Sequence, residues 1–75
     1  MIHKVRTSMA GLQKYIKAHP RKNLTGFFDY GGRPLSHREV KLIVDYAVLH
    51  GYETEADIPD EEVELLLNPK PKGGN

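Results

Sequence analysis

The sequence has no cysteine among its 75 residues. This absence excludes a disulfide scaffold, a zinc site built on thiolates and a cysteine nucleophile. Long apolar runs are missing too: aliphatic residues occur at most three in a row, whereas a membrane-spanning helix needs about 20. Hydrophobic residues still make up 39% of the chain, which is enough for a core and argues against disorder throughout.

The length fits one small domain. A chain this short buries only about 60–65% of the surface that it exposes when unfolded. A buried catalytic cleft would compete with the core for the same side chains, so the size argues against an enzyme.

The first predicted helix ends before Pro20, because the residue before a proline disfavours the α conformation. Its apolar positions recur at spacings of three and four, which is typical of one helical face. They are Ile2, Val5, Met9, Leu12 and Ile16. Thr7 and Ser8 can both serve as N-caps. The helix therefore begins either near residue 2 or only after Ser8, with residues 1–6 extended.

The second predicted helix has the clearest boundaries. Ser36 stands three residues before Glu39, the spacing of a capping box, and Gly51 suits the left-handed position after the last turn. We expect a helix from His37 to about His50. Its apolar residues cover a wide arc of the helical wheel, so this helix should be central, with the others packed against it.

The segment between these helices is aromatic and contains a pair of glycines. Leu24–Tyr30 has strand-like character, and Gly31-Gly32 can supply the positive φ of a tight turn. Pro34 allows at most an edge strand after that turn. A small hairpin and an ordered loop are both consistent with this pattern.

The third predicted helix covers Asp57–Leu67. Asp57 can cap it, and Pro59 is tolerated in its first turn. Asn68-Pro69 ends it. The sequence therefore predicts a mainly α, three-helix domain over residues 1–68, with a hairpin-like aromatic and Gly-Gly loop between the first two helices. The alternative is an α+β fold with a minor two-stranded element. Residues 69–75 form a Pro/Gly/Lys tail that we expect to be disordered.

Charge is segregated along the chain. Residues 1–38 hold eight basic residues against one acid, Asp29, a sum of +7. Residues 39–67 hold nine acids against one base, Lys41, a sum of −8. The formal net charge of +1 therefore hides a bipolar chain. Three interpretations stay open: the halves face each other, the basic half is an exposed patch for phosphates or an acidic partner, or copies associate head to tail.

Basic and aromatic residues alternate around the Gly-Gly turn, a composition that suits single-stranded nucleic acid. Either Phe27 or Phe28 is alternatively an anchor of the loop in the core. Candidate residues for binding a nucleic acid or an acidic partner are Lys14, Lys17, Arg21, Lys22, Phe27, Tyr30 and Arg33.

The sequence offers no catalytic, metal or cofactor site. Its four histidines are scattered, and Ser36 and Glu39 are better explained as the capping box than as catalytic groups. The N-terminal stretch has no secretory hydrophobic region, which predicts a cytoplasmic protein. We therefore expect a non-enzymatic interaction or regulatory module with a protein partner and no membrane contact. The alternative is weak, largely sequence-independent nucleic-acid binding by the basic half.

Overall fold

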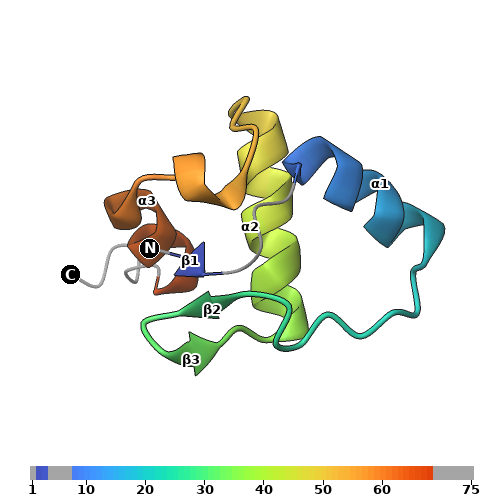
Figure 1. The fold of residues 1–75 in the computed structure, drawn as a ribbon, viewed down its shortest axis with the longest axis horizontal. Helices are drawn as coiled ribbons and strands as arrows, with labels where there is room; N and C mark the ends of the chain where they lie inside the picture. The colour runs from blue at the N-terminus through green and yellow to red at the C-terminus, as the bar shows by residue number, and fades with distance from the viewer. Residues whose placement is uncertain (1, 4–7, 69–75) are drawn as a thin grey trace, which may run out of the picture.

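The protein is described by a computed structural model that covers the backbone of residues 2–3 and all of residues 8–68 (Figure 1). Three α-helices and a small antiparallel sheet make up the fold, so the prediction of a mainly α domain with a minor β element is confirmed. The elements in chain order are β1 (Ile2–His3), α1 (Met9–Ala18), β2 (Asp29–Tyr30), β3 (Arg33–Pro34), α2 (His37–Leu49), the 3₁₀ turn η1 (Glu55–Asp57) and α3 (Asp60–Leu67).

Helix α2 is the central helix, as predicted. Helices α1 and α3 both pack against it and lie to either side of it (Figure 1). The side chains that it buries completely are Val40, Ile43, Val44 and Ala47. The buried arc is narrower than the apolar arc of the sequence, because Leu42 is 38% exposed and Leu49 is 80% exposed.

The ends of α2 follow the local signals of the sequence. The Ser36 hydroxyl accepts the backbone N–H of Glu39 at 3.2 Å, and the Glu39 carboxylate accepts the backbone N–H of Ser36 at 3.0 Å. Two donors at the start of the helix are thereby satisfied. At the other end Gly51 has a φ of +78°, the left-handed conformation that glycine adopts without strain.

Replacing Ser36 with alanine is expected to destabilise the domain by about 1 kcal/mol, because the N–H of Glu39 loses its acceptor. The measurement is the free energy of unfolding in urea. Ser36→Asp keeps an acceptor at the cap and should retain most of the stability. Equal stability of Ser36→Ala and the natural protein would contradict the structural role of this cap.

Helix α1 begins only at Met9. The Ser8 hydroxyl accepts the backbone N–H of Gly11 at 3.2 Å and caps the helix. Of the predicted helical stripe, Met9 and Leu12 are buried, whereas Ile2 belongs to strand β1 and Val5 lies outside the described residues. The predicted start after Ser8 is therefore confirmed. Of the predicted extended residues 1–6, Ile2 and His3 form a strand, and the others lie outside the described residues.

The predicted start of the third helix at Asp57 is wrong, because α3 begins at Asp60. Ile58 precedes Pro59 and is extended, with ψ at 122°, since the proline ring disfavours the α conformation of its neighbour. Asp57 caps η1 instead: its carboxylate accepts the backbone N–H of Thr54 at 3.1 Å. The tail predicted as disordered, residues 69–75, lies outside the described residues.

The predicted hairpin is present but short. Strands β2 and β3 are joined by Gly31 and Gly32, whose φ values of +60° and +80° suit a tight hairpin turn. β3 is an edge strand, while β1 pairs with the other side of β2, so the sheet has three strands. Phe28, just before β2, is fully buried and Phe27 is half-buried, so Phe28 is the core anchor of this loop.

Within the part of the chain that the structure describes, every helix is too short or too polar to cross a membrane.

Candidate functional site

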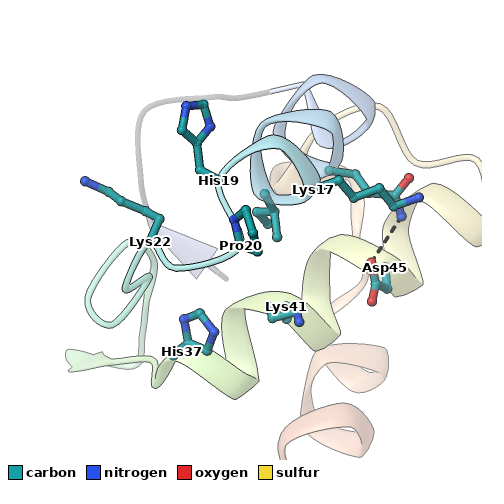
Figure 2. A pocket seen from close by; sticks show the side chains of 9 residues that line it. Lys17, His19, Pro20, Lys22, His37, Lys41 and Asp45 are labelled. Carbon is teal, nitrogen blue, oxygen red and sulfur yellow. Dashed lines mark hydrogen bonds between the residues drawn. The ribbon is translucent and has the colours of Figure 1, made fainter.

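A basic cleft lies between the second half of α1, the turn at residues 19–22 and the first half of α2 (Figure 2). Its volume is about 220 Å³. We call it the basic cleft; the titratable side chains that line it are Lys17, His19, Lys22, His37, Lys41 and Asp45.

Three lysines reach the basic cleft from three different segments. Lys17 comes from α1, Lys22 from the turn after it and Lys41 from α2, and all three are exposed. Figure 2 shows that their side chains spread outward from the rim of the cleft, with the Lys22 ammonium directed away from Lys41. The lining also includes one acid, Asp45, whose carboxylate accepts a hydrogen bond from the side-chain amide of Gln13 at 3.1 Å. The cleft therefore has excess positive charge on exposed side chains, which favours anionic ligands.

His37 connects two of the segments that form the basic cleft, the start of α2 and the loop after α1. Its Nδ1 accepts the backbone N–H of Leu24 at 3.0 Å, which places the proton of the neutral ring on Nε2. Leu24 is buried, at 2% exposure, so its N–H depends on this acceptor. The histidine thus fixes the segment after Lys22 to the start of α2.

A second, apolar cleft lies on the other flank of α1. Its volume is about 440 Å³. We call it the apolar cleft; its lining residues are Gly11, Leu12, Tyr15, Lys22, Leu24 and Phe27. Lys22 lines both clefts, so they adjoin at the turn that follows α1.

An aromatic stack also connects the two clefts. Tyr15 lines the apolar cleft and His19 lines the basic cleft, and their rings stack with centroids 4.3 Å apart. His19 Nδ1 donates to the backbone carbonyl of Tyr15 at 3.0 Å, which holds the imidazole in place. The stacked rings of Tyr15 and His19 therefore lie at the end of α1, between the apolar cleft and the basic cleft.

The residues predicted for binding are divided by the fold. Lys17 and Lys22 lie in the basic cleft, and Phe27 lies in the apolar cleft. Lys14 and Arg21 are exposed but line neither cleft.

The other two predicted residues, Tyr30 and Arg33, lie on the hairpin and are engaged by carboxylates. The Tyr30 hydroxyl donates to Glu64 at 2.8 Å, and the Arg33 guanidinium forms an ion pair with Glu39 at 3.1 Å. The structure therefore does not bring these two residues to the clefts.

The aromatic and basic side chains of the clefts that were not among the predicted binding residues are Tyr15, His19, His37 and Lys41. They form two pairs at the spacing i, i+4, Tyr15 with His19 and His37 with Lys41. This spacing places the two members of each pair on one helical face. That spacing was a usable signal. What brings the pairs together is the packing of α1 on α2, for which the sequence has no local pattern.

Two glutamates of α3, Glu62 and Glu64, accept hydrogen bonds from tyrosine hydroxyls. Glu62 accepts the hydroxyls of Tyr46 at 2.7 Å and Tyr52 at 2.8 Å. The hydrogen bond to Glu62 raises the pKa of Tyr46 to about 12, and the two hydroxyls hold the pKa of Glu62 below its ordinary value.

An ion pair joins the two charged halves at the start of α2, where the Arg33 guanidinium lies 3.1 Å from the Glu39 carboxylate. Helices α1 and α3 lie on opposite sides of α2 (Figure 1), so Lys17 of α1 and the acids of α3 belong to elements on opposite sides of the central helix.

Replacing Glu62 with glutamine is expected to lower the pKa of Tyr46 and Tyr52, because the carboxylate that holds their protons is lost. The absorbance of phenolate at about pH 10.5, just above the ordinary tyrosine pKa of about 10, should rise. The pKa of Tyr46 is higher in the folded protein than in the unfolded chain, where it is about 10. The hydrogen bond from Tyr46 to Glu62 therefore contributes its full stabilisation below pH 10, and this contribution is lost as the pH rises through about 12.

Glu61→Gln is the matched control, since Glu61 is exposed on the same helix turn and the charge change is identical. An equal rise in phenolate in both variants would show that the net charge, and not the hydrogen bond, sets these pKa values.

Among the described residues, histidine, aspartate and glutamate side chains form no group of three that could hold a metal ion. Comparison with family models, curated proteins and solved structures finds no match for this chain.

Proposed function

We propose that this chain is a non-enzymatic module that binds the phosphate backbone of a nucleic acid, weakly and largely without sequence preference. One observation carries the proposal: Lys17, Lys22 and Lys41 line a single cleft against one carboxylate, that of Asp45. The cytoplasmic location inferred from the sequence stays a prediction.

Lysine ammonium groups suit this task because they are compact charges on flexible stems and contact phosphates without demanding one geometry. Each phosphate that they neutralise releases condensed counterions, which drives binding at low salt. Three such contacts predict a slope of log K against log salt of about −2 to −3.

An acidic protein partner would also be attracted by these lysines, and a protein partner is what the sequence favoured. The apolar cleft favours a nucleic acid instead, since Tyr15 and Phe27 lie beside the cations and aromatic rings next to lysines suit bases next to phosphates. Binding to a protein partner is therefore the outcome to which a negative result would point.

The test is an anisotropy titration of fluorescent single-stranded and duplex oligonucleotides at salt concentrations from about 50 to 200 mM. We expect affinity to fall as salt rises. Lys17→Glu should weaken binding at every sequence and reduce the salt slope by about one.

Lys14→Glu is the matched control: it lies on the same helix, is exposed, carries the same charge change and lines neither cleft. It should weaken binding less than Lys17→Glu. Absence of binding at about 50 mM salt, where electrostatic affinity is strong, would overturn the proposal. Equal effects of the two variants would overturn the assignment to the basic cleft.

A further inference from the structure

The apolar cleft has the chemistry of a site for a flat aromatic group. Its walls are the side chains of Leu12 and Leu24, which are almost fully buried, and two aromatic rings of which Tyr15 is 40% exposed. Its volume of about 440 Å³ is within the range of small-molecule sites in proteins. A phosphate gains little from such a surface, whereas a nucleobase can bury a ring face against it.

The two clefts lie within reach of one nucleotide chain. Lys22 borders both, and the stacked pair of Tyr15 and His19 places one ring in each. A strand that passes around the end of α1 would therefore meet aromatic and apolar side chains first and ammonium groups next. Bases and phosphates alternate in the same way along a single strand.

We infer that the ligand is single-stranded, with one base in the apolar cleft against Tyr15 and Phe27 and the adjoining phosphates in the basic cleft. The inference rests on the proposed function and adds the state of the nucleic acid. Duplex bases are stacked and paired, so they cannot enter a cleft without being unpaired first, whereas single-strand bases are free to do so.

The experiment compares three ligands on the natural protein: a single-stranded oligonucleotide, the same backbone with abasic sites in place of every base, and the duplex of the same sequence. The abasic strand carries all the phosphates and none of the rings. We expect the single strand to bind about tenfold more tightly than the abasic strand, the contribution of one stacked base.

Variants locate the base. Tyr15→Ala should weaken binding of the single strand about tenfold and leave the abasic strand unchanged, and Tyr15→Phe, which keeps the ring, should restore the affinity. Leu49→Ala, at an 80% exposed position of α2 that lines neither cleft, is the control for loss of an exposed apolar side chain.

The outcomes separate the two proposals. Equal affinity for the single strand and the abasic strand, or tighter binding of the duplex, would overturn the base site and leave phosphate binding intact. Natural affinity in Tyr15→Ala would overturn the role of the apolar cleft. Failure of all three ligands to bind would overturn the proposed function and the base site together.

Discussion

Replacing Phe28 with alanine is expected to unfold the domain. Phe28 is the largest fully buried side chain, and it joins the loop before β2 to the core formed with α1, α2 and α3. Its truncation costs about 3–5 kcal/mol in lost apolar contacts and in the cavity left behind. A single core in a chain of this length supplies about 3–5 kcal/mol in total, so little or no stability should remain.

The measurement is a thermal melt followed by far-UV circular dichroism. Leu49→Ala is the matched control, because this side chain is 80% exposed and its loss should change the free energy of unfolding by less than about 0.5 kcal/mol. A cooperative melt of Phe28→Ala at the natural temperature would contradict the position assigned to Phe28 in the core.

Replacing His37 with leucine is expected to destabilise the domain by about 1–3 kcal/mol, the cost of a buried N–H that has lost its acceptor. The group concerned is the backbone N–H of Leu24, which donates to His37 Nδ1 at 3.0 Å. The free energy of unfolding in urea measures the loss. Binding of oligonucleotide should weaken too, since this bond fixes the segment that carries Lys22.

His37→Asn provides the control for this prediction. The side-chain oxygen of asparagine can occupy the position of Nδ1 and accept the same N–H, whereas leucine cannot. The asparagine variant should therefore recover most of the stability. If both variants were equally unstable, the contribution of His37 would be packing and not the hydrogen bond.

The fold was predictable where local chemistry decides the conformation. Ser36 and Glu39 defined the start of α2, Gly51 its end, and the Gly31-Gly32 pair the turn of the hairpin. The start of α3 was not predictable in the same way. Asp57 and Pro59 each fit the first turn of a helix, but the proline restricts Ile58, and this restriction separates a 3₁₀ turn from the helix.

The site was predictable in its chemistry and only partly in its residues. The basic and aromatic composition pointed to Lys17, Lys22 and Phe27, which line the two clefts. Composition could not show that the Arg33 guanidinium pairs with Glu39, six residues further along at the start of α2. Nor could it show that the Tyr30 hydroxyl donates to Glu64, which is 34 residues away in the sequence. Such long-range partners are set by tertiary packing alone.

The central claim, that the clefts at the end of α1 bind nucleic acid, is tested most directly by mapping the contact. Backbone amide shifts would be recorded by NMR while a single-stranded oligonucleotide is added at low salt. We predict that the largest changes fall in residues 11–27 and 37–45, which include the lining of both clefts. Changes centred on α3, changes spread evenly over the domain, or no changes would contradict the account.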